Sequence, residues 1–233
     1  MSERRKPPTE FDAYAVDYAE QLRDPLRERF TASNRFFFVR KLEVIQSFYR
    51  RRSVDTHTLA WLDAGCGQGD LLNVAASHFK SAAGCDPSEG MLKACDAFEV
   101  KHQTAEDRLP FEDAQFDFVT AVCVYHHVPG ERRLALTREL QRVLKPEGIV
   151  CIIEHNPLNP VTRLIVSRSP VDADAQLLGV SETKRLVLSV GAQVVESSYF
   201  LFFPQSVYAM LAPLERALSS IPMGGQYAVF AQK

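Results

Sequence analysis

The chain has 233 residues, of which 46% are hydrophobic and 24% charged, and its net charge at neutral pH is -2. This length suits one α/β domain, or one domain with a small cap, and the composition is that of an ordinary globular protein. The charge argues against a broad nucleic-acid-binding surface, which would need an excess of basic residues.

The cysteines and the N-terminus indicate a reducing, cytoplasmic setting. The five cysteines fall mostly in or beside apolar runs, and none belongs to a CxxC pair or has metal-ligand spacing (Cys66, Cys85, Cys95, Cys123 and Cys151). We therefore expect free thiols and no metal site. No apolar stretch of signal length follows the N-terminal residues, and no run reaches the roughly 18 apolar residues of a membrane span.

Residues 1–52 are predicted to form an N-terminal helical cap. After a polar tail over residues 1–9, apolar positions follow helical spacing from Glu10 to Leu22, and Pro25 closes that pattern. A second helix is expected from about Ser33 to Arg50. Residues 53–233 would then form the main domain.

From residue 59 onward, short apolar runs alternate with turns and helical patterns. Predicted strands cover Leu59–Ala64, Ala82–Asp86, Glu99–Gln103, Phe116–Val124, Ile149–Glu154, Val194–Phe203 and Tyr227–Ala231. Predicted helices cover Asp70–Phe79, Glu89–Phe98, Arg132–Leu144 and Ser181–Val190, the last with Ser181 as N-cap and Gly191 just beyond its end. This alternation predicts a largely parallel sheet covered on both faces.

Two segments interrupt that alternation near the C-terminus. Residues 156–180 contain three prolines and are expected to be irregular, with one short helix. Residues 204–222 keep a helical stripe ahead of the last strand. We expect both segments to be insertions around an acceptor site.

The strongest chemical signal is a glycine-rich turn after the first predicted strand. The strand ends in Asp63, and a turn with Gly65, Gly67 and Gly69 leads into a helix. Glycines let the backbone turn tightly and let a ligand approach closely, and a helix N-terminus offers N–H groups to an anion such as a carboxylate. A turn that binds NAD has GxGxxG spacing, whereas this one has GxGxG with Asp70 at the third position. The spacing favours a methionine-bearing nucleoside over a pyrophosphate.

The next strand ends in a second acidic residue, Asp86, which could accept hydrogen bonds from both ribose hydroxyls. Asp86 could instead cap the following helix, but Ser88 already fits that role. A turn over residues 104–111 would lie beside the nucleoside and could offer a backbone N–H to the adenine edge.

In this order the features resemble the class I S-adenosylmethionine-dependent methyltransferases, in particular the group related to quinone-biosynthesis C-methyltransferases. The matching stretches begin at Leu62, Gly84, Ala105, Tyr125 and Arg142, within about residues 59–155. The resemblance implies a Rossmann-like, doubly wound, mostly parallel sheet of seven strands with an antiparallel last strand and helices on both faces. It also implies transfer of a methyl group from S-adenosylmethionine to an O, N or C atom of a small-molecule acceptor.

The resemblance further implies which residues bind the cofactor. Asp63, Gly65 and Gly67 would contact the methionine moiety, and Asp86 would hold the ribose. Met91 would pack on the adenine, and the Ala105 N–H would bond it. Relatives often have an acid at the position of Thr104, so the contact with the adenine amino group would be weaker here or would shift to Glu106. The predicted cofactor-binding residues also include Pro87 and Cys123. Tyr18 and Arg40 are candidates to reach the methionine carboxylate. For these last two, simple packing or solvation is the alternative.

On the acceptor side, polar residues follow two strands: Tyr125-His126-His127 and Glu154-His155-Asn156. A histidine suits proton removal near neutral pH, so His126 or His155 is the predicted general base, with Tyr125 and Glu154 shaping the pocket. Alternatively, the paired histidines anchor their loop, which is the preferred interpretation for His127.

The acceptor itself stays open, as an anionic, aromatic or lipid-linked small molecule. Arg163 and Arg168 could clamp an anion or be solvated, and five aromatic residues could suit an apolar acceptor or form an ordinary core (Tyr199, Phe200, Phe202, Phe203 and Tyr208). No nucleic acid and no membrane span are expected, and both monomer and homodimer remain open. The alternatives to a methyltransferase are a cofactor-binding protein without catalysis and a nicotinamide-dependent oxidoreductase.

Overall fold

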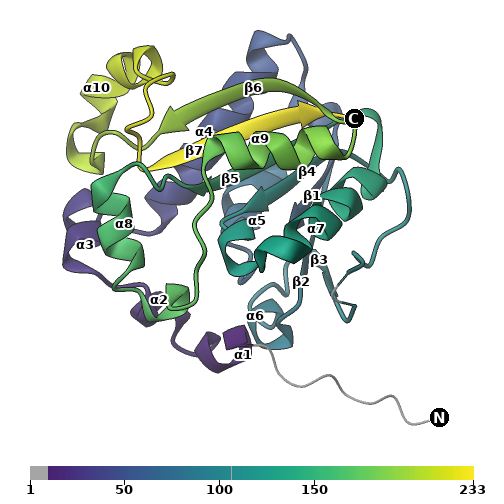
Figure 1. The fold of residues 1–233 in the computed structure, drawn as a ribbon, viewed down its shortest axis with the longest axis horizontal. Coiled ribbons are helices and arrows are strands. Elements are labelled where there is room, and N and C mark those ends of the chain that lie inside the picture. Colours follow the sequence, from purple (N-terminus) through teal and green to yellow (C-terminus); the bar gives the residue numbers. More distant parts are fainter. Residues whose placement is uncertain (1–9, 106) are drawn as a thin grey trace.

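The computed structural model describes residues 10–105 and 107–233 and shows one sheet of seven strands between helices (Figure 1). The strand order is β3-β2-β1-β4-β5-β7-β6. Neighbours among β1 to β5 pair in parallel, and β7 is antiparallel to both β5 and β6. The strands are β1 (Ala60–Ala64), β2 (Ser81–Asp86), β3 (Glu99–His102), β4 (Phe116–Val122), β5 (Leu144–His155), β6 (Gln193–Phe200) and β7 (Gln226–Gln232). The predicted doubly wound sheet is confirmed.

Strand order reverses between β1 and β4, and this switch point determines where a ligand can bind. In open sheets of this kind ligands lie outside the carboxyl ends of the strands, where the connections diverge to opposite faces. The carboxyl ends of β1, β4 and β5 are at Ala64, Val122 and His155. The turns that carry the predicted functional residues therefore meet at one edge of the sheet.

Helices cover both faces of the sheet. The helices are α1 (Glu10–Tyr14), α2 (Tyr18–Gln21), α3 (Pro25–Phe30), α4 (Arg35–Arg51), α5 (Asp70–Ala75), α6 (Glu89–Leu92), α7 (Gly130–Val143), α8 (Pro160–Val166), α9 (Val180–Ser189) and α10 (Gln205–Ala217). Residues of α4 and α5 share one apolar core with the sheet, and residues of α7 and α9 share the other. Figure 1 shows α7 and α9 on the near face, with α1 and α6 next to each other.

The N-terminal helices differ from the prediction. The expected single helix from Glu10 to Leu22 is broken between α1 and α2, and Pro25 opens α3 where we expected it to close a helix. The reason lies in Asp24, whose Oδ1 accepts the backbone N–H groups of Leu26 (2.7 Å) and Arg27 (3.3 Å). A proline in the first turn has no N–H to leave unbonded, so Asp24 and Pro25 together start a helix.

Helix starts depend on such local contacts, and the sequence identified some correctly. Ser88 caps α6 as predicted, since its hydroxyl accepts the N–H of Met91 (3.1 Å). The prediction for Ser181 is wrong, because α9 begins one residue earlier, at Val180, with Gly179 as its N-cap. Gly191 lies just beyond that helix with φ of 86°, as its predicted C-terminal role requires.

Helix α4 packs directly on the sheet. The Phe48 ring stacks on Phe230 of β7, with centroids 4.0 Å apart and planes 5° apart, and both side chains are fully buried. Trp61 of β1, Phe118 of β4 and Tyr49 belong to the same core. This part of the predicted cap shares the main core, so the boundary at residue 52 stays a prediction.

Removing the Phe48 ring should destabilise the whole domain. We expect Phe48→Ala to lower the free energy of unfolding by about 3–5 kcal/mol, because it leaves a cavity between α4 and the sheet. Urea denaturation followed by circular dichroism measures this. The control Met210→Ala changes a residue that is 73% exposed and should cost less than about 0.5 kcal/mol. Equal effects of the two substitutions would contradict the shared core.

Candidate active site

The glycine turn after β1 has the backbone that its sequence predicts. Gly65, Gly67 and Gly69 have φ values of 75°, 53° and 77°, a region that side chains disfavour. A Cβ at Gly65 would collide with the Val124 side chain, whereas one at Gly67 would meet no heavy atom within 4 Å. The backbone at Gly67 is thus open to a ligand.

Asp86 fixes this turn to the end of β2. Its Oδ2 accepts the Gly67 N–H (2.9 Å) and its Oδ1 accepts the Ser88 N–H (2.8 Å). The carboxylate is buried, and each oxygen keeps a further lone pair for a ligand hydroxyl. Asp63 lies on the adjacent strand, paired in register with Gly84. The structure therefore brings the two predicted carboxylates together.

Asp63 is buried and unusually basic for a carboxyl group. Its Oδ1 accepts the Thr120 hydroxyl at 2.7 Å. Burial raises the pKa of Asp63 to about 7, although the Thr120 hydrogen bond and the charge of Lys41 partly oppose this. A cation held beside Asp63 would favour its ionised form.

Helix α1 closes over the cofactor edge of the site. Asp12 Oδ1 accepts the Ser88 hydroxyl (2.7 Å) and the Gly90 N–H (2.8 Å), and the Gln68 amide donates to the Ala15 carbonyl (2.7 Å). These bonds join the N-terminal segment to both the glycine turn and α6. A segment so placed can exclude water from a bound ligand.

The remaining predicted adenine contacts are on β2, α6 and the turn after β3. Met91 is buried, and the Pro87 carbonyl lies 3.0 Å from His102 Nε2. Ala105 is exposed, and its carbonyl accepts the Gln103 amide (3.1 Å). The prediction for Glu106 lies outside the described residues.

Arg40 has other partners than the predicted cofactor. Its guanidinium bonds Glu43 and Glu215 and lies 3.7 Å from the centroid of the Tyr208 ring. The structure therefore does not bring Arg40 to the glycine turn. Its neighbour Lys41 has the opposite environment: it is buried and has no hydrogen bond or ion pair with any residue in the described ranges.

Lys41 faces the site, which sequence reasoning missed. Burial lowers its pKa, and the charged groups that act on it are Cys123, Arg27, Asp70 and Asp63. Arg27 likewise has its pKa lowered by burial and lies among Tyr18, Cys123, Asp172 and Asp70. A polar residue among the apolar positions of a helix is only a weak sequence signal for a site residue. Only the fold shows that the side of α4 with Lys41 lies toward the site.

Tyr18 reaches the site from α2. Burial raises the pKa of its hydroxyl, and the Cys123 and Asp172 charges act in the same direction. Cys123 follows β4 with φ of 57°, an uncommon value for a residue with a side chain. Such strain is often found at functional sites.

The Glu154 carboxylate holds the Tyr125–His127 turn in place through two contacts. Glu154 is fully buried; its Oε1 accepts the Tyr125 N–H (2.7 Å) and its Oε2 lies 2.5 Å from His126 Nδ1. The Tyr125 hydroxyl bonds Thr137 in the core at 2.9 Å. Tyr125 and Glu154 therefore support the turn, where we predicted that they would line the acceptor pocket.

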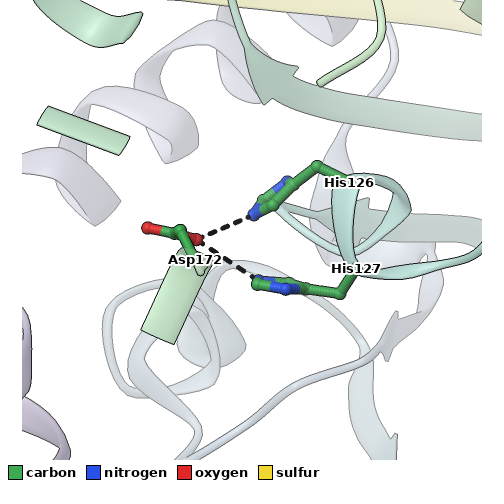
Figure 2. A group of neighbouring side chains, drawn as sticks. All are labelled: His126, His127 and Asp172. Carbon is green, nitrogen blue, oxygen red and sulfur yellow. Dashed lines mark ion pairs between the residues drawn. The ribbon is translucent and has the colours of Figure 1, made fainter. Parts of the chain in front are cut away.

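His126 lies between two carboxylates. Its Nε2 is 3.3 Å from Asp172 Oδ1, and His127 Nε2 is 3.5 Å from the same oxygen (Figure 2). Burial would lower the pKa of His126, but the charges of Glu154 and Asp172 outweigh burial and raise it to about 10. Burial and the charge on His126 lower the pKa of His127 and of His155 to about 4. No sequence pattern singled out Asp172.

His155 has a different environment from His126. Its Nδ1 lies 3.5 Å from the Gln226 amide nitrogen, which also contacts Cys123 Sγ at 3.3 Å. The His155 ring centroid is 5.0 Å from that of His126. His155, Cys123 and Gln226 thus meet where β4 and β5 end and β7 begins.

The predicted anion clamp does not converge on this site. Arg163 and Arg168 are exposed, and Arg168 Nη1 lies 3.9 Å from Asp24 Oδ2.

No helix within the described ranges is long and apolar enough to cross a bilayer. All five cysteines are free thiols.

Comparison with known sequences identifies the central part of the chain. Residues 62–152 match a family model described as a methyltransferase domain. The demethylmenaquinone methyltransferase of Staphylococcus saprophyticus is 40% identical over 111 residues, 43% of this chain and 46% of that protein. The tRNA (carboxymethyluridine(34)-5-O)-methyltransferase of Arabidopsis thaliana is 34% identical over 48% of this chain and 28% of its own length. The chain thus matches less than half the length of these relatives.

Solved structures extend the likeness to nearly the whole fold. A methyltransferase dependent on S-adenosylmethionine from Thermotoga maritima, described as a possible histamine N-methyltransferase, superposes with a TM-score of 0.67. Their sequences are 16% identical, and the match covers 96% of this chain and 98% of that one. Residues 62–152 therefore match the methyltransferase domain family, and the chain has the fold of the S-adenosylmethionine-dependent methyltransferases.

Proposed function

We propose that the protein transfers the methyl group of S-adenosylmethionine to a small-molecule acceptor. The observation that carries this proposal is the glycine turn, which Asp86 holds in place and which is open at Gly67. A nucleoside with an amino-acid tail fits such a turn, since Asp86 can accept ribose hydroxyls and the open backbone can approach the tail.

The cofactor would lie along the ends of β1 and β2. Its methionine ammonium would lie against Asp63, and its adenine near Met91 and the turn after β3. Lys41 would serve the methionine carboxylate in the role that we predicted for Arg40. Lys41 suits this role because its buried ammonium contacts the Phe38 ring but no carboxylate among the described residues, and such a cation gains most from an anion.

We infer that His155 is the proton acceptor for a hydroxyl or amine. Both ring nitrogens of His126 lie against carboxylates, whereas His155 Nε2 has no hydrogen-bond partner among the described residues. In the reaction the acceptor atom forms a bond to the methyl carbon while the carbon–sulfur bond breaks. The acceptor proton would pass to His155 and then to solvent, and S-adenosylhomocysteine would be left.

The acceptor class rests on indirect support. One relative is named for demethylmenaquinone and another for a tRNA, but the net charge of -2 favours a small molecule over a nucleic acid. The free thiols support a reducing compartment such as the cytoplasm. The segments 156–180 and 204–222 would complete the acceptor side.

Replacing His155 should slow methyl transfer without weakening cofactor binding. We expect His155→Gln to lower kcat by roughly 10²–10⁴-fold, because the reaction would lose its proton acceptor. The measurement uses labelled S-adenosylmethionine and an acceptor found by screening small phenols, amines and enolisable carbonyls.

The matched control is His78→Gln, which changes a histidine in a short turn after α5. The affinity for S-adenosylhomocysteine should be the same in both variants and the parent. Unchanged turnover of His155→Gln at saturating cofactor would rule out this role. A screen in which no acceptor is methylated would favour a cofactor-binding protein without catalysis.

Cofactor affinity should depend on pH through Asp63. The pKa of Asp63 in the free protein is about 7, and a bound ammonium or sulfonium would lower it. Binding therefore releases a proton below pH 7, so affinity for S-adenosylmethionine should rise by up to about tenfold per pH unit up to pH 7 and then level off. Calorimetric titration between pH 5.5 and 8 measures this.

Two variants separate Asp63 from other titrating groups. Asp63→Asn keeps a partner for Thr120 but carries no charge, so its affinity should be nearly independent of pH. Lys41→Met removes a charge that lowers the pKa of Asp63, so the levelling point should move to higher pH. A pH profile of Asp63→Asn that equals the parent profile would show that another group is responsible.

A further inference from the structure

The two histidines of the Tyr125–His127 turn and Asp172 point toward one another. His126 Nε2, His127 Nε2 and one oxygen of Asp172 all lie within 4.8 Å of each other (Figure 2). The two histidines follow β4, and Asp172 comes from a short turn in the segment between β5 and α9. The fold thus brings together three metal-ligating side chains from segments 45 residues apart.

The spacing of these atoms fits metal ligands better than hydrogen bonds. The Asp172 oxygen lies 3.3 Å from His126 Nε2 and 3.5 Å from His127 Nε2. Charge-assisted hydrogen bonds are about 2.7–2.9 Å long. Ligands placed about 2.0–2.2 Å from a tetrahedral ion are about 3.3–3.6 Å from each other. The ligand nitrogens of His126 and His127 lie within 4.8 Å of each other, so these two atoms would have to move closer together when an ion binds.

The surroundings supply the second layer that a metal-binding histidine needs. Such a histidine usually donates its other ring N–H to a carboxylate, which fixes its tautomer and orientation. His126 Nδ1 lies 2.5 Å from Glu154 Oε2, and Glu154 is itself held by the Tyr125 N–H. Phe11 packs edge-on against the His127 ring, with centroids 4.8 Å apart.

The charges also match a divalent ion. Glu154 is fully buried and Asp172 is mostly buried, so together they place two negative charges around His126. A divalent cation bound to neutral His126 would add two positive charges beside these carboxylates, in addition to the charge of Arg27, which lies near Asp172.

We propose that His126 Nε2, His127 Nε2 and Asp172 Oδ1 bind a divalent transition-metal ion such as Zn²⁺ or Co²⁺. Two imidazoles and a carboxylate are borderline ligands that suit these ions better than Mg²⁺ or Ca²⁺. Three protein ligands leave at least one position open, as in catalytic zinc sites. This proposal departs from the sequence-based expectation that the chain has no metal site.

The role that we assign to the ion rests on the proposed methyl transfer, whereas the metal site itself does not. The open position would bind an acceptor hydroxyl and lower its pKa, so that the oxygen attacks as an alkoxide or phenolate. The acceptor proton would pass to His155 while the oxygen forms its bond to the methyl carbon and the carbon–sulfur bond breaks. The acceptor class is then an alcohol, phenol or enol.

The test is metal binding to the purified full chain without cofactor or acceptor. After dialysis against a chelator, titration with Zn²⁺ should show one equivalent bound with a Kd in the micromolar range or below. Co²⁺ should bind at the same stoichiometry and give the visible absorption of a four- or five-coordinate ion. Asp172→Asn and His127→Gln should each weaken binding by about 100-fold or more, and Glu154→Gln by about 10–100-fold.

The controls are Asp174→Asn, an exposed acid two residues from Asp172, and His78→Gln, which lies outside the cluster. Both should bind Zn²⁺ and Co²⁺ like the parent. Circular dichroism and S-adenosylhomocysteine affinity show whether each ligand variant is folded. If Glu154→Gln does not fold, the two ligand variants still decide the matter.

Failure to bind one equivalent of either ion would overturn the proposal, as would ligand variants that bind as tightly as the controls. Neither result affects the proposed methyl transfer, because this titration contains no methyl donor. Conversely, a chain that binds the metal but methylates no acceptor would keep the site and lose the proposed function.

Discussion

The hydrogen bonds that the Asp86 carboxylate accepts are the constraint on which the site depends. A turn of three glycines has many conformations, and Asp86 selects one by accepting the Gly67 N–H while it also accepts the Ser88 N–H. Asp12 extends the same network to α1 through the Ser88 hydroxyl. The cofactor edge of the sheet and the segment that covers it are therefore held by one connected set of hydrogen bonds, and a ligand finds the turn already in place.

Helix α4 connects that site to the rest of the fold through two adjacent basic residues. Successive residues on a helix point about 100° apart, so Arg40 and Lys41 face different surroundings. Arg40 pairs with Glu215 and thereby joins α4 to α10, and Glu215 also accepts the Phe202 N–H. Lys41 lies near Asp63 of β1 and Cys123 after β4, and its ammonium contacts the Phe38 ring. Arg40 therefore stabilises the packing of α4 on α10, and we propose that its neighbour Lys41 serves the site.

The sequence predicted the sheet well because strand positions depend on apolar runs and on turn residues, which are local signals. Ser88 and Gly191 were recognised for the same reason. Pro25 was misinterpreted because a proline can either end a helix or begin one, and the Asp24 side chain decides which. Contacts between distant segments could not be predicted, because no local sequence signal indicates them. Examples are the contact of Asp172 with His126 and the support of the Tyr125 turn by Glu154. The position of Lys41, rather than Arg40, near the site is a third. These contacts give His155 and His126 different environments. The sequence therefore indicated where the candidate site lies, but it could not indicate which histidine accepts the proton.

The proposed function depends on a glycine turn, held by Asp86, that accommodates an adenosyl group with a methionine tail. Isothermal titration of the parent and of Asp86→Asn with S-adenosylhomocysteine and with NADH tests this most directly. We expect a Kd for S-adenosylhomocysteine on the order of 1–100 µM in the parent. We expect Asp86→Asn to bind S-adenosylhomocysteine about tenfold or more weakly, because hydrogen bonds to a charged group are lost, and we expect no measurable heat with NADH. Tight binding of NADH, or no binding of S-adenosylhomocysteine by the folded parent, would contradict it.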